Sequence, residues 1–263
     1  MAEEFEAGKF VEQREPGRVL ESFELQGHEV NNIRYAKIED FEGITEVDKA
    51  RWKERSELKN VPPIKASVIE TGELELEKGD LEKLHKNMPE KEKEIRSWYN
   101  EKLSQCEEGG IEFFKKGDEN LWKALKEESF SDEKKPFFLV IEVDGKVVGY
   151  IQIGGYFNQP EDFEPKDAIR VQTISLLPEY QRRKIKEGKD QEVSIAHKLL
   201  ELAVNEVKKE STSKDKSKLV LGTHIWTPQA VGFWVKEGFK RDKSVKEDDP
   251  YHLTMVKRLQ VDK

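Results

Sequence analysis

The chain has 263 residues, of which 38% are charged and 35% hydrophobic, and its formal net charge is −8. No apolar run approaches the ~20 residues that cross a bilayer, and the acidic N-terminus lacks a secretory signal, so we expect a cytoplasmic protein. Cys106 is the only cysteine, which excludes a disulfide framework and a cysteine-built metal site, and five scattered histidines do not suggest a metal centre. The length fits one large domain, or one domain with an insertion.

The negative charge is concentrated in one half of the chain. Residues 1–135 hold 34 acidic and 24 basic side chains, whereas residues 136–263 hold 20 acidic and 22 basic ones. A uniformly acidic surface would indicate little beyond solubility, but this asymmetry requires a functional reason. The overall acidity also argues against nucleic-acid binding, although residues 182–189 are locally basic.

The N-terminal part predicts a tail, a short strand and a helix. Residues 1–30 are acidic and poorly patterned, which is typical of a loosely ordered extension. Alternation over residues 33–37 predicts a strand. From Asp40, which suits an N-cap, apolar side chains recur at helical steps as far as Trp52, and the prolines at 62 and 63 then exclude further helix.

Residues 70–135 form a strongly charged region whose few apolar side chains follow helical spacing. Gly109, Gly110 and Gly117 divide this region into pieces. Two interpretations are open: an inserted element that recognises a substrate or partner, or a solvated helical hairpin with one apolar face. Cys106 lies in this region without a paired histidine, which favours a structural thiol.

From residue 136 onward the pattern is that of a mixed α/β domain. An apolar run at 137–143 predicts a central strand, Asp144 and Gly145 a hairpin turn, and 146–153 the returning strand. A strand–loop–helix unit follows, with a strand at 168–177 and a helix from about Glu192 to Lys209. After it come a strand at 218–223, a helix capped by Thr227 and Pro228 at its start and by Gly238 at its end, and a last strand at 253–257.

The loop before the helix at 192–209 is basic, since it carries Arg182, Arg183, Lys184, Lys186 and Lys189. The unsatisfied N–H groups at a helix N-terminus favour anions, above all phosphates. The loop and the helix start therefore predict a site for a polyanionic ligand, with a solvated surface loop as the alternative.

Three motifs follow one another in the second half of the chain. They are a strand end with Leu176, Pro178 and Tyr180, a helix opening with Gln191 and residues 194–203, and the segment AVGFWVKEGF at 230–239. In this order and spacing they resemble the GNAT superfamily of acyl-CoA N-acyltransferases. The resemblance covers about 33–55 and 136–258. It implies a single GNAT-like α/β domain over 31–258 with a mixed sheet, in which 56–135 is a helical insertion between the first helix and the central strands.

The resemblance also implies acetyl-CoA as co-substrate. It implies a sheet that splays after the strand at 174–176, where the pantetheine binds like an added strand, and a pyrophosphate on the main-chain N–H groups of residues 192–196. No metal and no covalent enzyme intermediate are implied. The coenzyme-binding residues expected on this basis are Ile174, Ser175, Leu176, Arg182, Arg183, Gln191, Glu192, Val193, Ser194, Ile195 and Ala196.

Three departures from the family pattern bear on the chemistry. The loop is about ten residues too long, and we place the small residues of the motif at Ser194 and Ala196, since a small side chain lets a pyrophosphate approach the backbone. Trp234 stands near a frequent acid tyrosine and cannot act as an acid, so we expect it to pack. Arg170 stands where a glutamate base is frequent, and a lysine acceptor with a pKa of about 10.4 would need such a base.

Three residues are candidates for catalysis. His224 could act as a base, Tyr251 as an acid, and Gln172, which alternation places on the side of Ile174 and Leu176, could bind the acceptor or the carbonyl. Two of them have a structural alternative: His224 as a packed or surface histidine, and Tyr251 as a tyrosine that anchors a strand.

We therefore expect an N-acetyltransferase that transfers an acetyl group from acetyl-CoA to a primary amine. It would be a monomer or homodimer that binds neither nucleic acid nor membrane. The negative balance of the N-terminal half favours a cationic acceptor. The alternative is a catalytically inactive GNAT-like module that binds acyl-CoA or a protein partner, which the altered loop, Trp234 and Arg170 favour.

Overall fold

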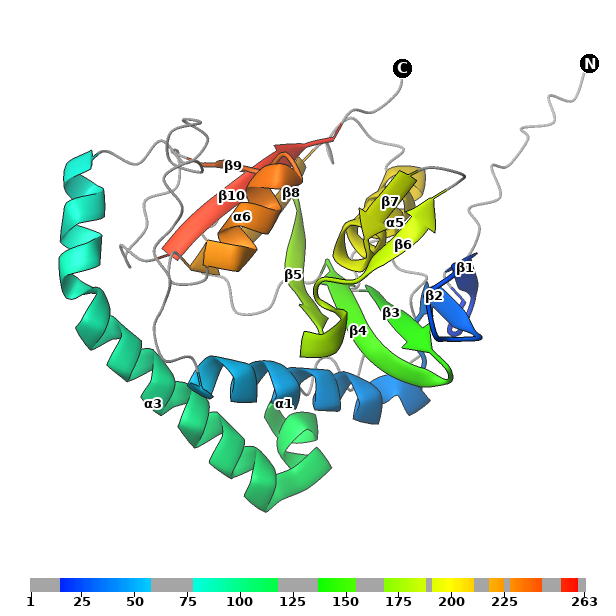
Figure 1. The fold of residues 1–263 in the computed structure, drawn as a ribbon, viewed down its shortest axis with the longest axis horizontal. Helices are drawn as coiled ribbons and strands as arrows, with labels where there is room; N and C mark the ends of the chain where they lie inside the picture. Colours follow the sequence, from blue (N-terminus) through cyan, green and yellow to red (C-terminus); the bar gives the residue numbers. More distant parts are fainter. Residues whose placement is uncertain are drawn as a thin grey trace, which may run out of the picture.

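The computed structural model describes residues 15–57, 78–117, 137–154, 168–187, 191–210, 218–224, 228–242 and 252–259. It contains an eight-stranded sheet in the order β1-β2-β3-β4-β5-β8-β10-β9 and a two-stranded sheet of β6 and β7 (Figure 1). Neighbouring strands of the large sheet are antiparallel except β5 and β8, which are parallel. The predicted α/β fold with a mixed sheet is confirmed.

The strands are β1 (Val19–Ser22), β2 (Asn31–Tyr35), β3 (Phe137–Val143), β4 (Lys146–Ile153), β5 (Ala168–Leu176), β6 (Lys184–Glu187), β7 (Gln191–Ser194), β8 (Lys218–His224), β9 (Lys240–Arg241) and β10 (His252–Arg258). The helices are the short turns η1 (Ile38–Asp40) and η2 (Pro178–Tyr180), and the longer α1 (Phe41–Glu57), α3 (Lys78–Gly117), α5 (Ile195–Glu210) and α6 (Pro228–Lys236). No described helix is long and apolar enough to cross a membrane.

The hairpin of β3 and β4 forms the centre of the core. Its turn residues Asp144 and Gly145 have φ angles of 48° and 79°. A two-residue hairpin turn of this kind needs left-handed backbone at both positions, which glycine adopts freely and aspartate tolerates. The predicted turn and both predicted strands are confirmed.

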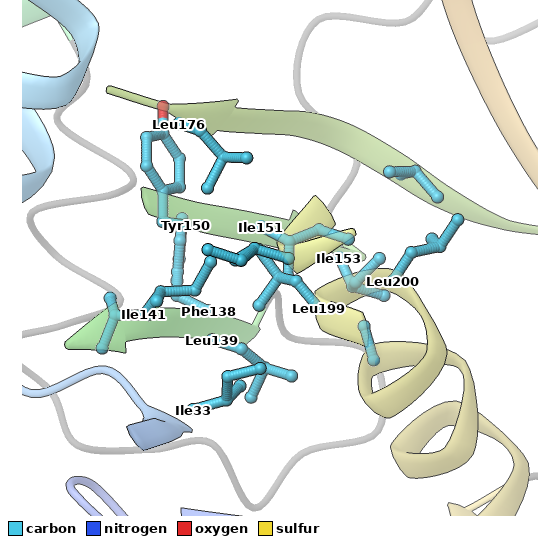
Figure 2. Close-up of a cluster of buried hydrophobic side chains, with 14 of the residues drawn as sticks. Ile33, Phe138, Leu139, Ile141, Tyr150, Ile151, Ile153, Leu176, Leu199 and Leu200 are labelled. Atoms are coloured by element: carbon cyan, nitrogen blue, oxygen red, sulfur yellow. The ribbon is translucent and has the colours of Figure 1, made fainter. Parts of the chain in front are cut away.

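Helices cover both faces of this part of the sheet. Figure 2 shows Ile151 and Ile153 of β4 beside Leu199 and Leu200 of α5, and all four side chains are at most 1% exposed. Each such side chain contributes about 1.5–3 kcal/mol when it leaves water. Successive residues of a strand point to opposite faces, and Tyr150 accordingly donates to the Asp48 carboxylate of α1 at 2.9 Å. The sheet thus lies between α5 and α1.

Residues 19–22 form the edge strand β1, where the sequence predicted a loosely ordered tail. The segment VLES has no apolar face that would indicate a strand, and its side chains are exposed or half-buried. A buried carboxylate holds this segment in place. Glu206 of α5 accepts hydrogen bonds from Arg18 at 3.0 Å, from the Tyr35 hydroxyl at 2.5 Å and from Lys209 at 2.8 Å.

The predicted first helix is confirmed as α1, and the role of Asp40 is larger than a cap. Asp40 immediately precedes α1, and its carboxylate accepts the Lys37 N–H at 2.8 Å and two bonds from Arg34, at 2.6 and 2.8 Å. Arg34 also bonds Glu142 of β3. Burial lowers the pKa of Arg34, but the bonds to Asp40 and Glu142 outweigh it and raise the pKa above its ordinary value. This buried network fixes the entry of the chain into α1.

The charged region at 70–135 is helical where it is described. Gly110 adopts a φ of 54° and interrupts α3, which ends at Gly117, so the breaks predicted at these glycines are confirmed. The helix packs against α1 through Trp52 and Phe113, whose ring centroids lie 6.1 Å apart. The Cys106 thiol is 1% exposed, as a structural thiol should be. Residues 58–77, with the two prolines, and 118–136 lie outside the described residues.

Candidate functional site

Strands β5 and β8 begin side by side and then separate. Their parallel pairing joins only residues 168–170 of β5 to residues 218–220 of β8. Beyond this point, within the described sheet, β5 continues to Leu176 paired with β4 alone, while β8 continues to His224 paired with β10. We call residues 171–176 and 221–224 the β5–β8 fork (Figure 1). Since a strand directs alternate N–H and C=O groups to each edge, the fork presents main-chain donors and acceptors that β8 does not use.

A β-bulge lies at the point where the two strands part. Gln152 of β4 lies opposite Thr173, but the next residue, Ile153, lies opposite Val171, so Gln172 is the extra residue of the bulge. A bulge bends its strand and increases the local twist. The bulge therefore accounts for the divergence of β5 from β8. The predicted splay is present, and it begins several residues earlier than expected.

The basic loop after β5 contains a β-hairpin. Strands β6 and β7 pair antiparallel with Ile185 opposite Val193, and the Ile185 side chain is 2% exposed. The prediction that the helix begins near Glu192 is wrong, because residues 191–194 form β7 and α5 starts at Ile195. The hairpin provides the roughly ten residues by which the loop exceeds the family pattern.

Two main-chain N–H groups in the first turn of α5 already have acceptors within the chain. The Ser194 hydroxyl accepts the His197 N–H at 3.1 Å, as an N-cap does. The Ile195 N–H donates to the Arg183 carbonyl at 3.3 Å. A helix start has four N–H groups without intrahelical partners, so these bonds leave fewer for a phosphate than predicted. The main chain of residues 192–194 belongs to the hairpin rather than to the helix start.

Arg183 lies against the turn between β1 and β2. Its Nη1 is 3.2 Å from His28 Nε2, and His28 Nδ1 is 2.8 Å from the Asp144 carboxylate. The neutral histidine therefore accepts from Arg183 and donates to Asp144. The bond from His28, with further bonds from main-chain N–H groups, lowers the pKa of Asp144. Arg183 also lies 5.1 Å from the centroid of the Tyr180 ring. This predicted coenzyme ligand thus already has partners within the chain.

The other basic side chains of the loop face solvent. Arg182, Lys184 and Lys186 are exposed, and Lys184 Nζ lies 3.5 Å from the Glu192 carboxylate. Lys189 lies outside the described residues. Exposed cations of this kind attract an anion electrostatically, but they do not form a structured binding pocket for it.

His197 and Glu237 form a pair beside the start of α5. His197 Nδ1 lies 2.8 and 2.9 Å from the two carboxylate oxygens of Glu237. Glu237 follows α6, and its position is fixed by the helix end, where the Gly238 N–H donates to the Val235 carbonyl and Gly238 has a φ of 81°. The predicted Gly238 cap is confirmed. The pair itself was not predicted, because its members lie 40 positions apart in sequence.

A polar cluster lies on the face of β5 that α1 covers. Arg51 Nη1 donates to the hydroxyls of Thr173 and Ser175 at 3.1 and 3.2 Å. Its Nη2 lies 3.1 Å from the Asp48 carboxylate, which also accepts the Tyr150 hydroxyl. The sequence did not indicate this cluster, although serine and threonine at alternate positions of a strand mark a polar face in retrospect.

The predicted catalytic residues are only partly placed. Gln172 is the extra residue of the bulge. Alternation would place it on the face of Ile174 and Leu176, but across the bulge Val171 shares that face instead. The backbone of His224 lies opposite His252 at the end of the β8–β10 ladder. The side chains of His224 and Gln191, and all of Tyr251, lie outside what the structure describes.

Trp234 packs, as predicted. It is 6% exposed, and its ring centroid lies 4.9 Å from that of Phe233 and 5.2 Å from that of Phe239. Arg170 is half-buried on β5, where the fork begins, and burial lowers its pKa. No group of three or more histidine, cysteine or acidic side chains that could hold a metal occurs in the described part of the chain.

Part of the chain matches a known protein family. Residues 93–187 match the model of the acetyltransferase (GNAT) family. The match begins within α3, so it includes part of the segment 56–135 that we predicted as an insertion, and it ends with β6. No curated protein sequence is significantly similar to this chain.

Two solved structures illustrate the similarity. PaiA N-acetyltransferase from Thermoplasma acidophilum, in complex with coenzyme A, is 19% identical over 87% of this chain and 98% of that protein, with a TM-score of 0.46. YncA from Salmonella typhimurium, with its cofactor acetyl-CoA, is 14% identical over 88% of this chain and 94% of that protein, with a TM-score of 0.39. Because both scores lie below 0.5, the similarity to the family rests on the match over residues 93–187. The predicted resemblance is confirmed: residues 93–187 of this chain are similar to the GNAT family of acetyltransferases.

Proposed function

We propose that the protein is an N-acetyltransferase that transfers an acetyl group from acetyl-CoA to a primary amine. The observation that carries the proposal is the β5–β8 fork, where β5 runs on from residue 171 to 176 without pairing to β8. The pantetheine arm contains amides that bond as a peptide does, so it can lie along this edge like an added strand. Ile174, Ser175 and Leu176 would hold it.

The pyrophosphate would lie at the start of α5. A helix N-terminus carries partial positive charge and favours phosphate, and the small side chains of Ser194 and Ala196 allow close approach. Arg182, in the loop that precedes α5, is exposed, and His197 lies in the first turn of the helix. Arg183 and residues 191–193 would act indirectly, by holding the loop and the hairpin.

The reaction would be a direct attack of the neutral amine on the thioester carbon. A C–N bond forms, the C–S bond breaks, and the proton released by the amine ends on the coenzyme A thiolate or on water. A main-chain N–H near Leu176 would stabilise the charge that develops on the carbonyl oxygen. Because residue 170 is arginine rather than a carboxylate, an amine of lower pKa is the more favourable acceptor. His224 and Tyr251 remain candidates for proton transfer.

A binding module without activity is the second candidate. The observation in its favour is the start of α5, where Ser194 and Arg183 already occupy two main-chain N–H groups. Such a module would bind acetyl-CoA and release no coenzyme A with any amine. The two candidates therefore separate by turnover rather than by binding.

Thermal unfolding with acetyl-CoA tests the coenzyme site. A ligand that binds only the folded chain stabilises it by about 2.7 kcal/mol at a hundredfold excess over Kd, and this stabilisation raises the thermal midpoint. Ser194→Asp should abolish the shift, because aspartate caps a helix as well as serine does but repels a phosphate. Asn205→Asp places the same charge on the exposed middle of α5 and should preserve it. An unchanged shift in Ser194→Asp would contradict the placement of the pyrophosphate.

A further inference from the structure

One side of α1 contacts the end of β5 and the loop that follows it. Arg51 donates to the hydroxyls of Thr173 and Ser175 at 3.1 and 3.2 Å. Glu54, three positions further along the helix, lies on the same side and accepts the Gln181 amide at 2.9 Å. Gln181 directly follows η2. Two successive turns of α1 are thus tied to the part of β5 that belongs to the β5–β8 fork.

The Gln181 amide joins Glu54 to the main chain of Leu176. Its Nε2 donates to Glu54 Oε2 at 2.9 Å and lies 3.4 Å from the Leu176 carbonyl oxygen. Because both bonds meet at one nitrogen, the carboxylate and this carbonyl are no farther apart than the two bonds together. The proposed function places the thioester beside Leu176. Glu54 therefore brings a carboxylate from α1 to the proposed reacting centre.

The Glu54 carboxylate has an oxygen left for a ligand. Gln181 occupies Oε2, and within the described residues no hydrogen bond or ion pair to Oε1 occurs. The side chain is half-buried, so it keeps a path to solvent. Strand β5, AIRVQTISL, has no acidic residue, and arginine stands at 170 where a glutamate base was expected. Glu54 supplies from the first helix the carboxylate that the strand lacks.

Two arginines and two carboxylates lie along this side of α1. Arg51 Nη2 lies 3.1 Å from Asp48. Burial lowers the pKa of Arg55, while Tyr99 and Glu54 act in the opposite sense. Tyr99 belongs to α3, which packs on α1, and it also interacts with Arg51. With Glu54 ionised, the two positive and two negative charges balance. A proton taken up by Glu54 would leave a net positive charge, which favours release of that proton to water.

We propose that Glu54 is the base that accepts a proton from the acceptor amine. This inference rests on the proposed transfer of an acetyl group from acetyl-CoA. The ammonium gives one proton to Glu54 Oε1, and the neutral nitrogen then attacks the thioester carbon. The C–N bond forms, the C–S bond breaks, and a second proton passes from the nitrogen to the departing thiolate. Glu54 then releases its proton to water, and an amine as basic as a lysine side chain becomes a usable acceptor.

The pH dependence of the rate tests this role. Coenzyme A release from acetyl-CoA is measured on the full chain between pH 7 and pH 10 with spermidine, kanamycin and a lysine-rich peptide. At pH 7, Glu54→Gln should lower kcat/KM for the amine substrate about a hundredfold, since a general base contributes at least this factor. The deficit should shrink to within about threefold near pH 10, because an amine with a pKa of about 10.4 then loses its proton to water.

The variant is designed to keep the local structure. The amide of Glu54→Gln retains an oxygen that accepts from Gln181, so acetyl-CoA should raise its thermal midpoint as it does that of the wild type. Glu57→Gln is the matched control, because Glu57 is an exposed carboxylate at the end of the same helix, and it should change neither rate nor binding. As a readout apart from turnover, the amine substrate added with coenzyme A should raise the thermal midpoint of the wild type and fail to do so in Glu54→Gln.

Two kinds of result would overturn the inference, and they differ. If Glu54→Gln retains kcat/KM within about threefold of the wild type at pH 7, or if its deficit is the same at pH 10, Glu54 is not the base. The acetyltransferase assignment then stands. If acetyl-CoA raises the thermal midpoint of the wild type but no amine releases coenzyme A, the transfer itself is absent. The binding module is then supported, and the role of Glu54 fails together with the proposed function.

Discussion

Gly149 of β4 lies directly against the end of β5 that would hold the thioester. A Cβ added there would overlap the Leu176 side chain and would lie 2.9 Å from the Ser175 carbonyl oxygen and 3.3 Å from Ile141 Cδ1. The leucine can rotate, but the carbonyl oxygen moves only if β5 moves. Gly149→Ala should therefore destabilise the fold by about 2 kcal/mol, within the usual range for overpacking. For a domain of this size that corresponds to a thermal midpoint lowered by roughly 4–8 °C.

The same displacement should weaken acetyl-CoA binding, because it moves the edge of the β5–β8 fork. The assay is thermal unfolding followed by circular dichroism, with and without acetyl-CoA. Gly232→Ala is the control, since no atom lies within 4 Å of a Cβ at this position of α6. It should raise stability by up to about 1 kcal/mol, as alanine is the better helix former. A midpoint for Gly149→Ala within 1 °C of the wild type, on the order of 0.3 kcal/mol, would refute the reasoning.

Three other outcomes are expected. Ser194→Ala should lower the free energy of unfolding by about 1 kcal/mol in urea, because it removes the hydroxyl cap of α5; an unchanged midpoint would argue against the cap. Burial raises the pKa of Glu206, but bonds from Lys209 and Tyr35 outweigh it and hold the pKa below the ordinary 4.5. Glu206 therefore stabilises the fold above about pH 4.5, and this contribution is lost as the pH falls through the lowered value. Glu206→Gln should cost about 3 kcal/mol at pH 7, and the difference in thermal midpoint from the wild type should shrink below pH 4.5; a constant difference would contradict this. Burial also raises the pKa of Cys106, so iodoacetamide at pH 8 should label the thiol only in unfolded protein, and rapid labelling of the folded chain would show that α3 separates from α1.

The elements that the sequence predicted well are those whose signal is local. The β3–β4 hairpin has two apolar runs and a turn that only a few residue types can make. The end of α6 has a glycine at the position that requires left-handed backbone. Both features depend on neighbours within a few positions, so periodicity and residue type suffice to identify them.

The errors have a common cause in long-range contacts. The sequence predicts a helix from about Glu192, yet residues 192–194 belong to a strand, because they pair with β6, whose Ile185 is buried. β1 was missed because its place depends on Arg18 reaching Glu206, 188 positions away. Local propensity does not decide such segments when tertiary hydrogen bonds are available.

In the candidate site, too, the features with a local sequence signal could be predicted and those that depend on long-range contacts could not. The strand on which we propose that the coenzyme binds could be predicted from its motif, because Leu176 and Pro178 lie close together in sequence. The hydrogen bonds from Arg51 to β5 could not, since Arg51 and Ser175 lie 124 positions apart and only the fold brings them together. The bulge at Gln172 was equally hidden, because it is a property of the register between two strands.

The hydrogen bond between Arg18 and the buried carboxylate of Glu206 also determines where the folded domain begins. The sequence alone would place the domain boundary at residue 31, after the poorly patterned segment. A protein shortened to that boundary would lose Arg18 from Glu206 and His28 from Arg183, and would expose the main-chain edge of β2 that β1 now covers. Such a fragment would tend to self-associate through this edge, so any truncation or fusion intended to preserve the fold should begin no later than Arg18.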